Sequence, residues 1–149
     1  MSDKSIDTNT LWLVWEFVST IKPKFIRIAE QHGITLQQLH LLGTLDITTP
    51  TPMSKLATGL ACDASNVTGL VDRLSNTGFA KRVDCQSDRR IKMVLLTEKG
   101  AEMQKRIKED FFRSCRSTIE DALTPAELES FQATLHKLIV TAQTPTDVK

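Results

Sequence analysis

The stretch Met53–Gly100 constrains the fold of this chain most, because it combines two short helical segments with a hairpin. Apolar residues recur at helical spacing from Ser54 to Leu60, and Asp63 then provides a typical N-cap for a second helix. Gly78 follows as the expected C′ residue. The apolar stripe of the second helix, at i, i+3, i+4 and i+7, consists of Val67, Leu70, Val71 and Leu74. The stretch therefore predicts a helix-turn-helix.

A β-hairpin should follow the second helix. Residues typical of strands occur from Phe79 to Val83 and from Ile91 to Leu96, with the polar loop Asp84–Arg90 between them. Residues 73–92 carry six basic side chains against two acidic ones, a net charge of +4 in a chain of 149 residues whose total is +1. A helix-turn-helix followed by a basic hairpin is a winged helix. Such a local charge excess is typical of a surface that binds a phosphate backbone.

The polar faces of the second helix suit a helix placed against base edges and phosphates, because their side chains are short and form hydrogen bonds. The candidate DNA contacts on this helix are Ser65, Asn66, Thr68, Gly69 and Arg73. The candidates in the hairpin are Lys81, Arg82, Asp88, Arg89, Arg90 and Lys92. Gly69 costs about 1 kcal/mol of helix propensity relative to Ala. A glycine at this position is explained either by close approach to DNA or by tolerance of that cost. The alternative for both sets is that these side chains meet only water.

Three motifs resemble the MarR family of bacterial transcription factors: DASNVTGLVDRLSNTGF from Asp63, DRR from Asp88 and LTEKG from Leu96. The resemblance covers roughly a third of the chain. It implies a winged-helix homodimer that binds palindromic double-stranded DNA, usually as a repressor, and that a small-molecule effector or an oxidant often releases. It also implies that one of Arg89 and Arg90 enters the minor groove, which one being left open, and that Asp88 forms a salt bridge that holds the wing. A short strand near Pro52 would pair with the wing.

The remainder of the chain has the pattern of amphipathic helices. Leu11–Gln31 predicts one long helix that Pro23 should kink or split, and Thr35 with Gln38 forms a capping box for the next. After the wing, Thr97 should cap a long helix, and Thr124-Pro125 should start the last one before a polar tail from Thr141.

These elements predict one mainly α domain with a small β wing. Residues 35–96 would form the winged helix-turn-helix DNA-binding lobe, and residues 8–33 and 97–142 the dimerisation helices. A single recognition helix and wing bury too little surface for tight specific binding, whereas two half-sites about one helical turn apart suffice. The alternative is that the terminal helices only cover the core of a monomer.

Composition argues against several other classes. No apolar run reaches about 18 residues, so no membrane span is expected. The polar N-terminus lacks a signal-peptide core, which favours the cytoplasm. Three cysteines without a CxxC pair, and three histidines without metal-ligand spacing, predict neither a disulfide framework nor a metal site. No nucleophile elbow or phosphate loop is present, so we expect no enzyme and no cofactor.

Two finer hypotheses concern regulation. An effector cleft of the kind usual in the family would involve Trp15, Phe25, His40 and Phe111. Cys85 lies in the basic loop, where neighbours can favour a thiolate, and is the candidate for a redox switch, whereas Cys62 and Cys115 are typical of packing positions.

A winged helix used only for protein contacts is a further alternative. The charge of the hairpin counts against it, because interface cores are depleted in charge.

Overall fold

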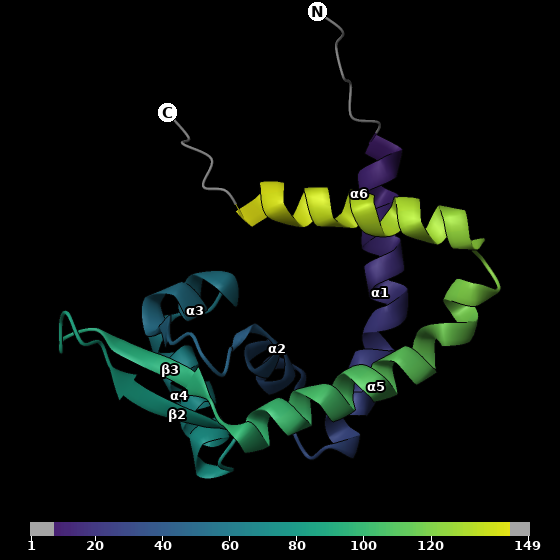
Figure 1. Cartoon of the computed structure of the whole chain (residues 1–149). Helices are drawn as coiled ribbons and strands as arrows, with labels where there is room; N and C mark the ends of the chain where they lie inside the picture. The colour runs from purple at the N-terminus through teal and green to yellow at the C-terminus, as the bar shows by residue number, and fades with distance from the viewer. Residues whose placement is uncertain (1–7, 144–149) are drawn as a thin grey trace, which may run out of the picture. The chain divides into compact units, whose positions relative to one another are not determined.

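The computed structural model describes residues 8–143, so the polar segment at the N-terminus and the last part of the polar tail lie outside the described residues. The chain divides into two compact units, residues 1–111 and 112–149. The helices of the first unit are α1 (Thr8–Gln31), α2 (Leu36–Thr44), α3 (Met53–Gly59), α4 (Ala64–Asn76) and the first half of α5 (Glu98–Glu120). Its strands are β1 (Thr51–Pro52), β2 (Ala80–Asp84) and β3 (Lys92–Leu96). Figure 1 labels these elements.

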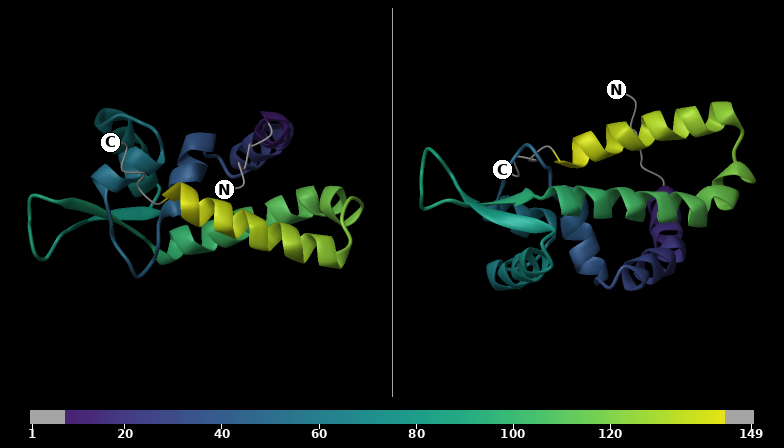
Figure 2. Two further views of the ribbon diagram at one scale, coloured as in Figure 1. Left: turned by 90° about the horizontal axis from the view of Figure 1, so that it is seen from above. Right: turned by 60° about the horizontal axis from the view of Figure 1, so that its bottom comes forward.

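The three strands form an antiparallel sheet in the order β1-β3-β2. In the hairpin, Ala80 lies opposite Leu96 and Asp84 opposite Lys92, while β1 pairs with β3 through Thr51 and Pro52. Both further views show the β2–β3 hairpin extending away from the helices as a narrow ribbon (Figure 2). The predicted wing and its short third strand are therefore confirmed, as is the mainly α winged-helix fold.

Local hydrogen bonds account for where the helices begin and end. Thr35 and Gln38 make both bonds of a capping box at α2, and the carboxylate of Asp63 accepts the backbone N–H of Asn66 at α4. The hydroxyl oxygen of Thr97 accepts the N–H of Gly100 at 3.0 Å, which starts α5. The chain turns after α4 at Gly78, where a φ of 77° is one that a side chain disfavours.

Two predictions about helix boundaries need correction. Of the two effects expected of Pro23, a kink or a split, the split is wrong, because α1 continues unbroken from Thr8 to Gln31. A proline removes one backbone donor, and the buried Ile28 and Ala29 anchor the turns that follow it. The last helix is longer than expected, since α6 (Pro125–Gln143) includes residues 141–143 that the sequence assigns to a polar tail.

The core of the first unit lies between α2, α4 and the sheet. The side chains that are almost completely buried are Leu41, Leu42, Val67, Val71, Leu74 and Val94. The first half of α5 is attached to this core by Gln104, whose side-chain amide donates to the backbone oxygens of Leu42 and Leu45 at the end of α2. The carbonyl of Leu42 also accepts the backbone N–H of Leu45 at 3.4 Å, so Gln104 adds a side-chain donor at the C-terminal end of α2.

α1 and α5 also meet directly within the first unit. The ring of His32 forms a hydrogen bond with the carboxylate of Asp110 at 2.8 Å, and the rings of Phe25 and Phe111 stack with their centroids 4.0 Å apart. These contacts fix the C-terminal half of α1 against α5.

The second unit contains the remainder of α5 and α6, which starts at Pro125 after a turn in which Thr124 and Glu127 exchange hydrogen bonds. α6 has no buried residue. Between residues 8 and 143, no helix combines the length and the apolar character that crossing a bilayer requires.

Candidate nucleic-acid interface

The helix α4 is divided into a buried stripe and an exposed polar face. Val67, Val71 and Leu74 are 0% exposed, because this stripe packs against the core. Because 3.6 residues make one turn, the face opposite that stripe is carried mainly by residues 65, 69, 72 and 76. Ser65, Asp72 and Asn76 are exposed there, and Gly69 leaves the helix backbone without a covering side chain.

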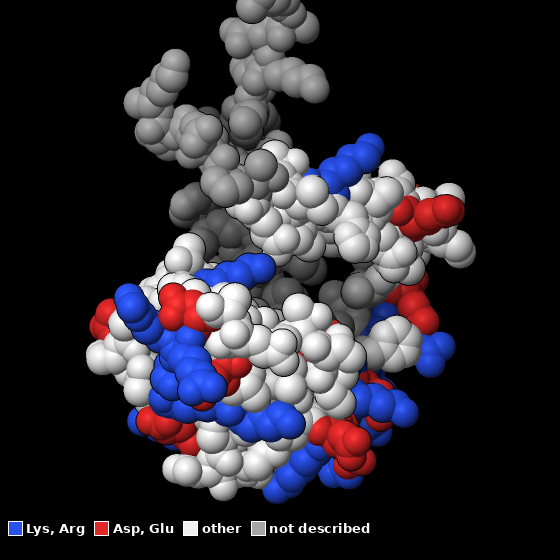
Figure 3. Space-filling view, turned by 60° about the vertical axis from the view of Figure 1, so that its left-hand side comes forward, with Lys and Arg blue, Asp and Glu red and all other residues white. Residues whose placement is uncertain are grey.

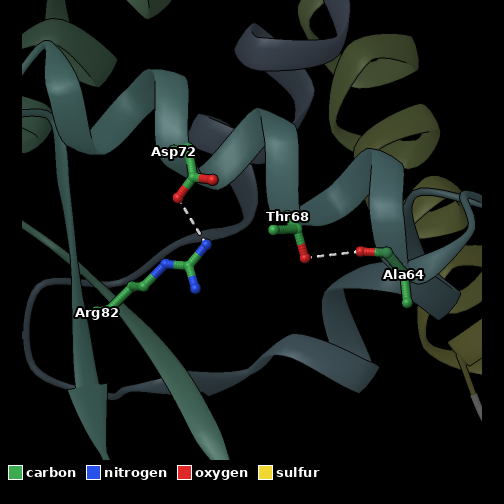
Figure 4. A network of polar contacts seen from close by, with 4 residues as sticks. All are labelled: Ala64, Thr68, Asp72 and Arg82. Carbon is green, nitrogen blue, oxygen red and sulfur yellow. Dashed lines mark hydrogen bonds and ion pairs between the residues drawn. The ribbon is translucent and has the colours of Figure 1, made fainter.

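The first turn of α4 is organised by Asp63. Its carboxylate accepts hydrogen bonds from the backbone N–H of Asn66 at 2.8 Å, the hydroxyl of Ser65 at 2.7 Å and the side-chain amide of Asn66 at 3.1 Å. The backbone N–H of Asn66, followed by the Ser65 hydroxyl, lowers the pKa of Asp63 below its usual value. The hydroxyl of Thr68 donates to the carbonyl of Ala64 at 2.8 Å (Figure 4). The predicted contacts Ser65, Asn66 and Thr68 therefore lie together, with their oxygens able to accept further hydrogen bonds.

The tip of the wing is shaped by Asp88. Its carboxylate accepts the backbone N–H of Arg90 at 2.9 Å, and its carbonyl accepts the N–H of Ile91 at 3.0 Å. Among residues 8–143 Asp88 takes part in no ion pair, so the salt bridge implied by the family resemblance is replaced here by hydrogen bonds to the backbone. Arg89 and Arg90 are both exposed at this turn.

The basic residues of the hairpin fall into two groups. Arg82 pairs with Asp72 of α4, and Lys92 pairs with Asp84 directly opposite it in the hairpin, each at 2.6 Å. Within the described part of the chain, the hairpin residues Lys81, Arg89 and Arg90 have no carboxylate partner, and neither has Arg73 at the end of α4. Figure 3, which brings the wing side of the molecule forward, shows Lys and Arg side chains gathered there around fewer carboxylates. The lobe thus presents uncompensated positive charge beside the polar face of α4.

The residues proposed for an effector cleft are only partly brought together. Phe25 and Phe111 stack and are half-buried, whereas Trp15 is 63% exposed on α1 and His40 is exposed on α2. Neither Trp15 nor His40 takes part in the stack. Over the described residues, no three His, Cys, Asp or Glu side chains are grouped so that they can hold a metal ion.

The three cysteines have different surroundings. Cys115 is buried, and the thiol of Cys62 donates to the carbonyl of Leu60 at 3.3 Å. The sulfur of Cys85 lies 3.1 Å from the hydroxyl of Ser87. Hydrogen bonds from that hydroxyl, and then from the backbone N–H groups of Asp88 and Ser87, lower the pKa of Cys85 from its ordinary value. The wing thus holds the cysteine whose thiolate is favoured.

The acidic partners of this surface are what sequence reasoning missed. Asp84 and Lys92 face each other across the hairpin, so a register assigned to the strands would have found this pair. Asp72 and Arg82 lie on different elements, and the sequence carries no signal that α4 and β2 bring them together.

Two helices joined by a tight turn, the second with an exposed polar face, are followed here by a basic antiparallel hairpin. This arrangement defines a winged helix-turn-helix domain. Residues 34–92 match the family model described as the MarR family. Over this segment the chain is similar to the MarR family.

Individual proteins extend this comparison. The chain is 37% identical over 76 residues to an uncharacterised HTH-type transcriptional regulator, YhbI of Bacillus subtilis, a match that spans 51% of this chain and 49% of that protein. The chain therefore matches about half the length of this relative. A MarR family protein from Bacillus stearothermophilus has the same fold, with a TM-score of 0.76 at 22% identity over 97% of this chain and 99% of that one. A MepR mutant from S. aureus, bound to an oligodeoxyribonucleotide, aligns with a TM-score of 0.62 at 24% identity over 92% and 100% of the two chains.

Proposed function

We propose that this protein is a sequence-specific DNA-binding transcriptional regulator. The observation that carries the proposal is the polar face of α4 beside the wing, where Arg73 of α4 and the hairpin residues Lys81, Arg89 and Arg90 have no carboxylate partner among residues 8–143. Surfaces of this kind attract phosphates, and the short polar side chains of a helix can then reach base edges. The oligonucleotide bound to the related MepR fold supports the same use of this lobe, residues 35–96.

In the proposed complex α4 lies in the major groove. Ser65, Asn66 and Thr68, in the first two turns, reach bases or phosphates, since a recognition helix contacts bases mainly through its N-terminal part. Gly69 allows the backbone to approach closely. Arg73 at the end of α4 contacts a phosphate or a guanine. The exposed arginine pair at the wing tip reaches the adjacent minor groove.

The remaining hairpin cations support this placement through the backbone of the duplex. Lys81, Arg82 and Lys92 lie along β2 and β3 and are proposed to contact phosphates. Asp88 acts indirectly, by holding the turn that presents the arginines. Phosphate contacts fix the register of the protein on the duplex, and the contacts of α4 supply the sequence preference.

We further propose that the functional unit is a homodimer. Within the single chain α1 leaves Leu11 and Trp12 62% and 65% exposed, and α6 leaves Leu138 and Val140 57% and 62% exposed. Large apolar side chains exposed along a helix are typical of association sites. Residues 8–33 and 97–142 would supply the dimerisation helices, and a two-fold dimer would match a palindrome with half-sites about one helical turn apart.

As a dimer on its operator, the protein would act as a repressor by occluding polymerase. A small molecule that favours a different spacing of the two recognition helices would release it. The half-buried stack of Phe25 and Phe111, with Trp15 and His40 as further candidates, is the proposed place of effector contact. The lowered pKa of Cys85 favours, as a second mode of release, oxidation in the wing. This function would place the protein in the cytoplasm, with the chromosome.

A salt titration tests the proposal. With about 6–8 phosphate contacts for the dimer, the slope of log affinity against log salt should be roughly −5 to −7 by fluorescence anisotropy. Arg89→Ala and Arg90→Ala should weaken binding to every duplex and make the slope less steep. Sedimentation should give a dimer at micromolar concentration. Unchanged affinity and slope in both variants would contradict the role of the wing, and a monomer that ignores DNA at low salt would refute the function.

A further inference from the structure

An ion pair joins the recognition helix to the wing. Arg82 Nη2, from the middle of β2, donates to Asp72 Oδ1 of α4 at 2.6 Å. Ala64, Thr68 and Asp72 follow one another at four-residue intervals and so form one row along the helix. Figure 4 shows the carboxylate of Asp72 turned toward the guanidinium group. The pair therefore connects the two elements that the proposed function places in adjacent grooves.

The fold does not depend on this contact. The two side chains remain 40% and 54% exposed, and exposed ion pairs contribute little to folding. The buried stripe of α4 already holds the helix, and all five residues of β2 pair with β3. A carboxylate on the polar face of α4 also repels phosphates, so its presence there calls for an explanation other than stability.

We propose that Asp72 is a positioning residue that sets the sequence discrimination of this surface by acting through Arg82. This inference rests on the proposed function. Because Asp72 engages one nitrogen of the planar guanidinium group, the donors on the other two nitrogens are held in a fixed orientation for DNA. At distances much larger than their 2.6 Å separation, the fields of the two opposite charges largely cancel. Arg82 then adds little to the sequence-independent electrostatic attraction to DNA. Its remaining N–H donors still form hydrogen bonds with a duplex of matching geometry.

A second ion pair in the same hairpin supplies a matched control. Lys92 and Asp84 are also 2.6 Å apart and are 56% and 61% exposed, but both belong to the hairpin. Replacing Asp72 or Asp84 by Asn removes one negative charge and releases one cation in each case. Only the first substitution breaks a link between α4 and the wing.

The experiment compares two duplexes of equal length, one carrying a site selected from a random library and one with the same bases scrambled. Fluorescence anisotropy of the full chain gives both affinities at several salt concentrations. For Asp72→Asn, affinity for scrambled DNA should rise, the salt slope should steepen by about 1 per protomer, and the ratio of the two affinities should fall about two- to fivefold. For Asp84→Asn both affinities should rise together and leave the ratio unchanged. Asp72→Glu, which keeps the carboxylate, should retain the wild-type ratio.

A further pair of variants shows whether Asp72 acts through Arg82. In an Arg82→Gln background, Asp72→Asn should no longer change the ratio. The inference is overturned if Asp72→Asn leaves the ratio intact, if Asp84→Asn lowers it equally, or if the effect of Asp72→Asn persists without Arg82. A wild-type protein that binds both duplexes alike, or neither, would instead refute the proposed function. Equal melting temperatures of wild type and Asp72→Asn would exclude loss of folding as the cause.

Discussion

Replacing Gly69 by Ala separates the stability of α4 from the use of its exposed face. A Cβ atom built on Gly69 meets no other atom within 4 Å, so the methyl group fits without strain. In a helix interior Ala is favoured over Gly by about 0.8–1.0 kcal/mol. The free energy of unfolding should rise by about that amount, which raises the melting temperature by roughly 2–4 °C at this chain length. Circular dichroism during thermal and urea unfolding measures both quantities.

The same methyl group should impair DNA binding. It would stand in the middle of the face proposed to approach the base edges, where one good base contact contributes about 1–3 kcal/mol. Losing one such contact lowers affinity for the selected site about 5- to 150-fold, while affinity for random DNA, set by phosphates, should change little. Gly43→Ala is the matched control: it lies in α2, also meets nothing within 4 Å, and should leave DNA binding unchanged. If Gly69→Ala binds the selected site as tightly as wild type, the proposed approach of α4 is wrong.

Three further predictions concern stability and reactivity. Gly100→Ala should lower the free energy of unfolding by about 3 kcal/mol in urea titrations, because its Cβ would overlap the backbone oxygen of Phe79; a near-neutral effect would contradict this packing. Gln104→Leu should cost about 1–3 kcal/mol by the same assay, because the carbonyls of Leu42 and Leu45 each lose a side-chain donor, and an unchanged midpoint would show that water replaces it. Cys85 should react with iodoacetamide faster than Cys62 and at lower pH, because hydrogen bonds lower its pKa; mass spectrometry of labelled peptides showing equal rates would refute this.

The parts of this fold that depend on neighbours in sequence were predictable. The caps at Thr35, Asp63, Thr97 and Thr124 each act on a residue three positions later, so the sequence displays both partners together. The β2–β3 hairpin was equally accessible, because strand-forming residues flank one polar loop. The sequence left open whether Pro23 kinks or splits the first helix, because whether a proline divides a helix depends on what holds the following turns, which is a property of the packed chain.

The contacts that join distant elements were not predictable. Arg82 finds Asp72 ten residues away, and Gln104 reaches Leu42 across 62 residues, in each case because the helices and strands first pack on the core. The candidate DNA contacts could be named from residue type and motif. Which of their basic side chains are paired with a carboxylate could not be predicted. The sequence shows six basic residues between positions 73 and 92, and the structure shows that two of them already have carboxylate partners.

Selection of bound duplexes from a random-sequence library tests the central claim most directly. The account predicts enrichment of a palindrome whose half-sites lie about 10 base pairs apart, bound by a dimer, since two copies of α4 would enter successive major grooves on one side of the duplex. A library that shows no enriched sequence, or a single unpaired half-site bound by one chain, would contradict it.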